Sequence, residues 1–160
     1  MFTAVRDGGD YGWPFCNANP RAVAGTLDLP LERDVQTNAD GSQRDCAALD
    51  KVSVALTPHS APLGMSFLQD SNVPMSLRNG AVVGLHGCWD CSRFIGHEVV
   101  FVPFDAQGMP GAAQTLVTGF VLDSVAKTRW GRPVDVVPHP DGSLLISDDY
   151  AGAIYALYPK

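Results

Sequence analysis

Residues 86–93 bring together residue types that bind metals or undergo redox chemistry. The segment reads HGCWDCSR, with an imidazole at His86 and thiols at Cys88 and Cys91. These are ligand types that zinc takes, but a closed zinc site needs four ligands and no second Cys-x-x-Cys occurs in the chain. We therefore expect no metal site here. A local disulfide between Cys88 and Cys91, or two free thiols, are the alternatives.

The other two cysteines, Cys16 and Cys46, lie 30 residues apart on either side of a polar segment. We interpret them as a structural disulfide, which would restrain a segment that has little core of its own. The alternative is two reduced, buried thiols that behave as small apolar residues. Four cysteines allow three pairings, and spacing alone does not choose between them.

Two histidines, His59 and His86, each lie at the edge of an apolar run. A single histidine in that position is more often a hydrogen-bonded structural residue than a general base, so no catalytic residue is assigned. The adjacent Asp148 and Asp149 point to opposite faces of an extended chain and do not easily share one cation. We expect them to cap a turn.

Composition and charge exclude several classes of function. The 160 residues carry 11 basic and 17 acidic side chains, a net charge of −6, which disfavours a nucleic-acid-binding surface. No apolar run approaches the roughly 18 residues of a membrane-spanning helix. The chain contains no G-x-S-x-G, H-E-x-x-H, Walker or G-x-G-x-x-G motif, so no motif supports a hydrolase or nucleotide-binding function. Residues 1–10 show neither the basic nor the apolar region of a signal peptide.

The elements that position these residues are predicted to be strands. Gly and Pro contribute 28 residues and acidic residues are almost all Asp, which is typical of a turn-rich β protein. From residue 52 onward, short apolar runs alternate with turn dipeptides such as Asn79-Gly80 and Asp141-Gly142. Residues 17–50 are polar and interrupted by prolines, and we interpret them as a long loop. The stretch 112–128 has some helical spacing, but its glycine and β-branched residues favour extended structure.

A weak repeat organises the strands into larger units. Segments starting at Ala61 and Pro133 share the order strand, Asn-Gly or Asp-Gly turn, strand, turn with glycine, strand. Such a unit resembles a blade of a β-propeller, which takes about 40–50 residues. The chain therefore has room for three or four blades, fewer than most closed rings contain.

Five strings, in order, carry a resemblance to a known family. They are YGWPFC at 11–16, HSAPLGM at 59–65, HGCWD at 86–90, WGRP at 130–133 and DGSLLISDD at 141–149. Together they resemble the C-terminal half of the glucose/sorbosone dehydrogenases, a quinoprotein family of six-bladed β-propellers that depends on pyrroloquinoline quinone (PQQ). The resemblance implies PQQ and calcium as cofactors, a sugar-type substrate and hydride transfer from that sugar to PQQ.

The resemblance also implies roles for individual residues. Arg132, in WGRP, matches a position that binds a carboxylate of the cofactor, and Arg93 is a weaker candidate for the same role. His59 and His86 match positions that line the central funnel. The family's string has Ser, Asn and Arg where this chain has Cys88, Asp90 and Cys91. The family's base and calcium ligands lie upstream of YGWP, so we expect this chain alone to be inactive.

The sequence therefore predicts an all-β fold, a partial β-propeller of about three blades of four-stranded antiparallel sheets, with a long disulfide-tied loop near the N-terminus. One domain would span 1–160: the end of a blade (1–16), a loop or insertion (17–50) and two blades (51–122 and 123–160). By resemblance the protein is periplasmic or secreted. The alternative to a truncated dehydrogenase is a non-catalytic binding or structural module, and either form would cover its open blade edges by homo-oligomerisation.

Overall fold

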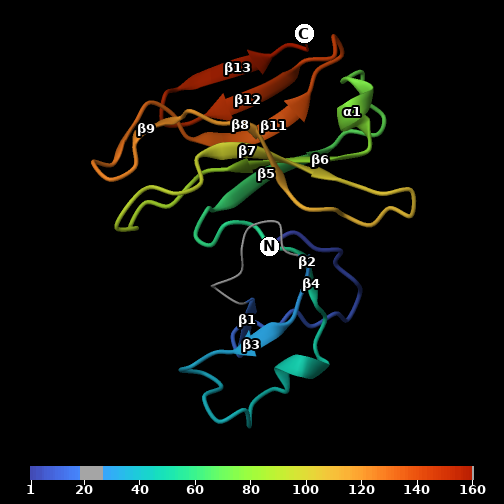
Figure 1. The fold of residues 1–160 in the computed structure, drawn as a ribbon, viewed down its shortest axis with the longest axis vertical. Coiled ribbons are helices and arrows are strands. Elements are labelled where there is room, and N and C mark those ends of the chain that lie inside the picture. The colour runs from blue at the N-terminus through green and yellow to red at the C-terminus, as the bar shows by residue number, and fades with distance from the viewer. Residues whose placement is uncertain (19–26, 160) are drawn as a thin grey trace. The chain divides into compact units, whose positions relative to one another are not determined.

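The computed structural model describes residues 1–18 and 27–159 (Figure 1). The chain forms two compact units, Met1–Leu56 and Thr57–Lys160. The regular structure of each unit is almost entirely antiparallel strand, and the described helices are a four-residue α-helix and a three-residue 3-10 helix.

The first unit has short strands and a small core. Its elements are β1 (Cys16–Ala18), β2 (Leu27–Leu29), β3 (Leu31–Arg33), the 3-10 helix η1 (Cys46–Ala48) and β4 (Val52–Val54). Strand β1 pairs with β3, and β2 pairs with β4. The core is Cys16, Leu29, Leu31, Cys46, Val52 and Ala55. Most of 27–50 is loop, and the strands that interrupt it are too short to show an alternating pattern in the sequence.

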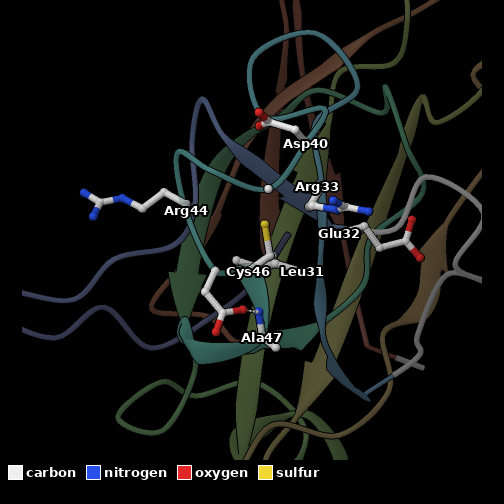
Figure 2. Close-up of a pocket in the computed structure, with 9 residues that line it drawn as sticks. Leu31, Glu32, Arg33, Asp40, Arg44, Cys46 and Ala47 are labelled. Carbon is white, nitrogen blue, oxygen red and sulfur yellow. Dashed lines mark hydrogen bonds between the residues drawn. The ribbon is translucent and has the colours of Figure 1, made fainter.

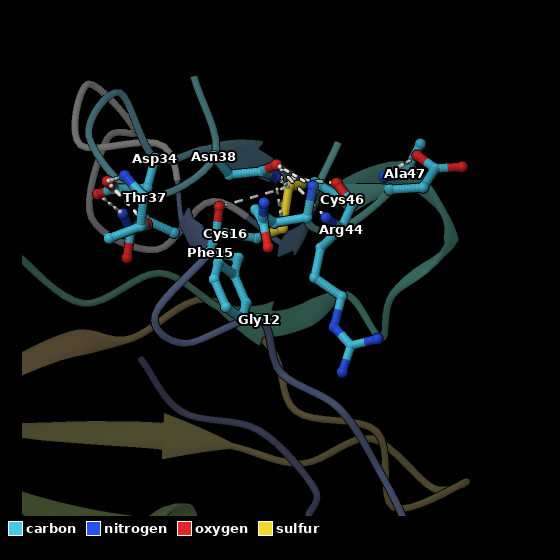
Figure 3. Close-up of a disulfide and its surroundings, with 12 residues drawn as sticks. Gly12, Phe15, Cys16, Asp34, Thr37, Asn38, Arg44, Cys46 and Ala47 are labelled. Carbon is cyan, nitrogen blue, oxygen red and sulfur yellow. Dashed lines mark hydrogen bonds between the residues drawn. A yellow bond between two sulfur atoms is a disulfide. The ribbon is translucent and has the colours of Figure 1, made fainter. Parts of the chain in front are cut away.

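The predicted disulfide between Cys16 and Cys46 is confirmed, with its Cα atoms 5.7 Å apart. Asn38 lies beside it (Figure 3) and is only 1% exposed. Its side-chain oxygen accepts from the backbone N–H groups of Gln43 and Arg44, and its nitrogen donates to the Arg44 carbonyl. The loop that the disulfide closes is therefore also held from inside.

The second unit contains two antiparallel meanders, the form of a propeller blade. The first has the order β5-β6-β7-β8, and the helix α1 precedes β6. The bounds of these elements are β5 (Pro62–Phe67), α1 (Met75–Arg78), β6 (Gly80–Leu85), β7 (Glu98–Pro103) and β8 (Gln114–Val117). Strand β6 is buried along its whole length, as expected for an uninterrupted apolar run inside a sheet.

The second meander is a three-stranded sheet among the described residues, in the order β11-β12-β13. A two-stranded ribbon of β9 and β10 precedes it, so the extended structure predicted for 112–128 is confirmed. The bounds are β9 (Val121–Asp123), β10 (Thr128–Arg129), β11 (Pro133–Pro138), β12 (Leu144–Asp148) and β13 (Ala153–Leu157).

Strand β11 packs against β5 and β6, which joins the two meanders face to face (Figure 1). Their shared core contains Leu68, Val73, Val82, Val99, Phe101, Val136, Leu144 and Ile146. The contact is close because Gly84 has no side chain: a Cβ atom there would lie 2.7 Å from the Val134 carbonyl oxygen. The predicted all-β class, with propeller-type meanders and a disulfide-tied loop, is confirmed.

Within the described ranges, no helix has the length and apolar character needed to cross a membrane.

Candidate functional site

Arg132 and His86 lie together in the second unit. His86 follows β6 and Arg132 precedes β11, so the packing of β11 on β6 brings them into contact. The Arg132 Nε donates to the His86 carbonyl at 3.0 Å, and its Nη2 donates to the Gly87 carbonyl at 2.9 Å. These two bonds fix the orientation of a half-buried guanidinium group.

The imidazole of His86 pairs with Asp149, with Nε2 and Oδ1 2.9 Å apart. The His86 side chain is 15% exposed, whereas that of Asp149 is 61% exposed. The hydrogen bond from His86 lowers the pKa of Asp149, and the charges of His86 and Arg132 lower it further. Asp149 is therefore a carboxylate at neutral pH. Because the imidazole of His86 is hydrogen-bonded to it, His86 fits the structural role expected for it rather than that of a general base.

A second arginine, Arg129, lies in the same cluster. Its Cζ atom is 4.5 Å from the ring centroid of Phe94 and 4.7 Å from that of Tyr150, so the guanidinium stacks on two aromatic rings. Its Nε is buried and has no hydrogen-bond partner. Such an orphaned donor is uncommon in native structures and calls for an acceptor.

His97 holds the other side of Arg129. The Nδ1 of this buried histidine lies 3.1 Å from the Ile95 carbonyl, which can only accept, so Nδ1 carries the proton. Nε2 is then free to accept from Arg129 Nη1 at 3.4 Å. Burial lowers the pKa of His97 to about 4, and the charge of Arg129 contributes in the same direction. His97 is therefore a neutral acceptor at physiological pH.

The cluster carries an excess of positive charge. Burial, followed by the repulsion of Arg129, lowers the pKa of Arg132, although its guanidinium stays charged in proteins. Among the described residues, neither arginine has a carboxylate within ion-pair distance, since Asp149 pairs with His86. Two oriented guanidinium groups that make no direct ion pair with a carboxylate are suited to a ligand with carboxylate groups.

The two remaining candidates, His59 and Arg93, lie elsewhere in the unit. Both line a pocket of about 480 Å³, together with Asp90, Cys91, Ser92 and Ile95. His59 is exposed and has a positive φ of 59°. No contact links these two side chains to Arg132 in the described part of the chain. The structure thus brings together Arg132 and His86 and leaves Arg93 and His59 at a separate surface.

The first unit has a pocket of its own, of about 610 Å³, floored by Leu31 and Cys46 (Figure 2). Its rim mixes charges of both signs, from Glu32, Arg33, Asp40, Arg44 and Asp45. Figure 2 shows Arg44 extending away from the other side chains, where it pairs with Asp10 at 3.5 Å. The pocket therefore offers no concentrated charge to select a ligand.

No group of three metal-binding side chains occurs in the part of the chain that the structure describes. In the HGCWDCSR string, His86 turns to Asp149 while the Cys88 thiol lies 3.5 Å from the Arg93 carbonyl. The string therefore does not converge on one point.

Sequence reasoning missed three members of the cluster: Arg129, His97 and Asp149. Asp148 and Asp149 do differ in environment, as expected of adjacent residues, and Asp148 caps a turn by accepting from the Ala151 N–H. Asp149 instead reaches a histidine 63 residues away. For Arg129, the sequence offered one signal: it lies three positions before Arg132, directly before the WGRP string.

Comparison with known proteins identifies a family and a relative of this chain. A family model described as TrAA12-like matches residues 3–160. An uncharacterized protein of Borreliella burgdorferi (strain B31) is 33% identical over 104 residues, which cover 64% of this chain and 27% of that protein.

Solved structures share the fold. The iodide structure of Trichoderma reesei Carbohydrate-Active Enzymes Family AA12 has a TM-score of 0.73 at 23% identity, and the match covers 93% of this chain and 39% of that one. The holo form of the pyranose dehydrogenase PQQ domain from Coprinopsis cinerea has a TM-score of 0.60 at 24% identity, covering 91% and 39%. The chain therefore has a quinoprotein-type fold and spans well under half the length of these relatives.

Proposed function

Because this chain belongs to the TrAA12-like family, we propose that it forms part of a quinoprotein oxidoreductase that oxidises an aldose- or sorbosone-type sugar. In this proposal, Arg129 and Arg132 bind the carboxylates of PQQ. His86 and His97 position the two arginines by accepting hydrogen bonds from them, and Asp149 holds the imidazole of His86. When bound, PQQ supplies the acceptor for the hydride that leaves the sugar.

One observation carries the proposal: two oriented arginines lack carboxylate partners, and the Nε of Arg129 is buried without an acceptor. A cofactor carboxylate would accept from that donor and neutralise the repulsion between Arg129 and Arg132. The stacking of Arg129 on Phe94 and Tyr150 keeps its planar fork in place before the ligand arrives, which lowers the entropic cost of binding. The chain's own residues therefore fit PQQ.

The described residues do not fit calcium in the same way. Calcium takes six to eight oxygen ligands, commonly from several carboxylates, and no such group of acidic side chains is found in the described ranges. Asp149 is engaged by His86, and Asp148 is buried at its turn. We derive no step through calcium. The proposal assigns no general base among these residues. It therefore includes the expectation that this chain alone has no dehydrogenase activity.

Titration of PQQ into variants of the full chain tests the cofactor site. Added PQQ should quench the tryptophan fluorescence of the wild-type protein, and the quenching should saturate. Replacing Arg132 or Arg129 by glutamine should weaken binding roughly 10- to 100-fold, because each removes a charged hydrogen bond of about 1.5–3 kcal/mol. Arg132→Lys should fall in between, since lysine keeps the charge and loses the fork.

Arg44→Gln, which removes a cation from the first unit, is the matched control and should bind PQQ as wild type does. Circular dichroism spectra and thermal midpoints check that each variant folds. If wild-type protein shows no saturable binding, or if the Arg132 and Arg129 variants bind as tightly as Arg44→Gln, the proposed site is wrong.

The alternative, a non-catalytic module that self-associates, is supported by the edge of the second meander. Strand β13 is the last strand of its sheet, and Ile154 on it is 73% exposed. Pairing with β13 of a second copy would cover this edge. Light scattering at micromolar concentration should then give a dimer that Ile154→Lys disrupts, and a clean monomer would contradict the alternative.

A periplasmic or secreted location is also part of the proposal. The disulfide Cys16–Cys46 supports it, because such bonds persist in oxidising compartments and are rare in the cytosol. Trapping free thiols in intact cells before lysis should leave Cys16 and Cys46 unlabelled, and labelling of both would overturn this location.

A further inference from the structure

The two cysteines outside the disulfide, Cys88 and Cys91, form a pair of thiols in contact. Cys88 is 3% exposed, whereas Cys91 is partly exposed and lines the pocket that also contains Asp90 and Ser92. The two cysteines lie three positions apart, and the interaction of the Cys91 thiol with that of Cys88 is the first cause of the raised pKa of Cys91. One thiol of the pair is thus partly accessible from solvent and the other is buried.

The backbone holds the two sulfurs differently. Cys88 follows β6 and donates its N–H to the Ile95 carbonyl at 3.2 Å, and the preceding Gly87 donates to the Ser60 carbonyl at 2.8 Å. Cys91 lies within residues 89–93, which form bends between β6 and β7. The Cys88 sulfur is held by the backbone next to the sheet, whereas Cys91 lies on a bend. A disulfide between them could therefore form and break without disturbing the sheet.

We propose that Cys88 and Cys91 form a second, reversible disulfide by exchange with a small-molecule disulfide such as oxidised glutathione. The deprotonated sulfur of Cys91 attacks one sulfur of the reagent, forming a mixed disulfide and releasing one reduced thiol. Cys88 then attacks the Cys91 sulfur and releases the second thiol. Two protein thiols are oxidised and one reagent disulfide is reduced, with the two protons passing to the two released thiolates.

Two observations favour this reaction over inert thiols. The chain already holds a disulfide at Cys16–Cys46, so it folds where an oxidant is available to any accessible pair. The buried partner also favours ring closure, because Cys88 is shielded from external reagents but in contact with Cys91. A mixed disulfide at Cys91 is therefore resolved from within the chain.

The electrostatics set the pH at which the exchange becomes fast. The hydrogen bond to Cys88, with burial and the charges of Cys88 and Asp90, raises the pKa of Cys91 to about 11. Because only the thiolate attacks, exchange should be slow at neutral pH and should accelerate up to about pH 11. An ordinary cysteine, with a pKa near 8.5, reaches its plateau at a lower pH.

The pair adjoins the arginine cluster through Gly87, whose carbonyl accepts from Arg132 while its neighbour is Cys88. Closure of the ring should therefore change the affinity of this cluster for carboxylates. This consequence rests on the proposed function. This change in affinity is measured separately, by comparing PQQ binding to the oxidised and the reduced chain. If the two forms bind PQQ equally, the proposed disulfide is still tested by the experiment described next.

The experiment equilibrates the full chain in buffers of stepped ratios of oxidised to reduced glutathione, quenches with acid and alkylates the free thiols. Cleavage after arginine and lysine places both cysteines on the peptide 79–93, separate from those containing Cys16 and Cys46. We expect Cys88 and Cys91 to lose alkylation together at an intermediate ratio, with this peptide two hydrogens lighter. Reduction should restore it while Cys16–Cys46 stays linked.

Single variants separate ring closure from adduct formation. Cys88→Ser should leave a stable glutathione adduct on Cys91, and Cys91→Ser should leave Cys88 unmodified because it is buried. The proposal is overturned if wild-type Cys91 accumulates the glutathione adduct, if the two thiols respond at different ratios, or if both are still alkylated at the most oxidising ratio.

Discussion

The imidazole of His97 shows how one buried residue sets the electrostatics of its neighbours. Its protonated Nδ1 is committed to the Ile95 carbonyl, and its Nε2 accepts from Arg129. Gly87 leaves room for the ring, since a Cβ atom there would lie 1.9 Å from His97 Nδ1. Protonation of Nε2 would place a third cation beside Arg129 and Arg132, so the site requires this histidine to be neutral.

This requirement predicts a loss of stability in mild acid. The pKa of His97 is about 4 in the folded chain and near 6.5 when unfolded, so between these values the unfolded chain binds the extra proton. Lowering the pH from 7 to 4 should therefore cost roughly 3 kcal/mol of unfolding free energy from this residue, and the loss should level off below about pH 4. Urea denaturation at stepped pH measures the effect.

The control is His97→Gln, which should remove much of the slope between pH 6.5 and 4.5. Should that variant not fold, the nuclear magnetic resonance titration of the wild-type histidines provides the same information. A His97 resonance that titrates near pH 6.5 would contradict the neutral, buried role.

At the scale of single residues, the sequence selected candidates by residue type and string, whereas most contacts between side chains were not predicted. Arg132 and His86 were selected from their strings, and they meet. Arg129 was missed because its position depends on Phe94 and Tyr150, which lie 35 and 21 positions away in the chain, and no local pattern encodes stacking between them. The same holds for Asp149, whose partner His86 follows a strand of the other meander, 63 positions away in the chain.

The strands were the part of the fold most readily predicted. Strands β6, β7 and β12 are apolar runs bounded by turn residues. Strand β12 pairs with β13 across a short turn, whereas residues 86–97 separate β6 from its partner β7. Strands β1, β2 and β3 have three residues each, too few to show the alternation that marks a strand. Their existence depends on the disulfide and on pairing with distant segments.

The packing of β11 on β6 depends on a glycine, which yields a prediction for this element. Gly84→Ala would bring a methyl group to 2.7 Å from the Val134 carbonyl oxygen, a backbone atom that cannot turn away. We expect the free energy of unfolding to fall by about 1–3 kcal/mol, the usual cost of overpacking. Urea denaturation measures it.

Gly111→Ala is the matched control, because Gly111 lies in a loop and an added Cβ atom would meet its nearest neighbour, Pro103 Cγ, at 3.2 Å. It should lose markedly less stability than Gly84→Ala. Equal stability of the two variants would mean that the sheets are not held at the close approach seen here.

The disulfide yields a second prediction for an element. Replacing Cys16 and Cys46 by serine removes a cross-link over a separation of 30 residues, worth about 3–4 kcal/mol of chain entropy. The core of the first unit is small, so this loss should open it. Hydrogen exchange should rise in peptides from residues 1–56 and stay unchanged in peptides from 57–160, where the long strands lie. A rise confined to the second unit, or none at all, would contradict this role.

At the scale of the whole molecule, the relatives are longer than this chain, which covers 39% of the Trichoderma reesei structure and 27% of the Borreliella burgdorferi protein. The proposed function is a carbohydrate oxidation, and in that proposal the arginine cluster supplies only part of what the reaction requires. Binding of a carboxylated cofactor and turnover of a sugar are therefore separable properties here.

We predict that the chain binds PQQ but does not turn over sugars. The arginine cluster provides oriented cations, whereas His86 is occupied by Asp149 and the described residues hold no group of three metal-binding side chains. A panel of aldoses, with PQQ, calcium and an artificial electron acceptor, should therefore give no acceptor reduction above a protein-free control. The same preparation should quench saturably with PQQ, which rules out misfolding as the cause. Clear turnover would show that base and metal ligands exist within this chain, and Arg132→Gln would then reveal whether that activity passes through the cluster.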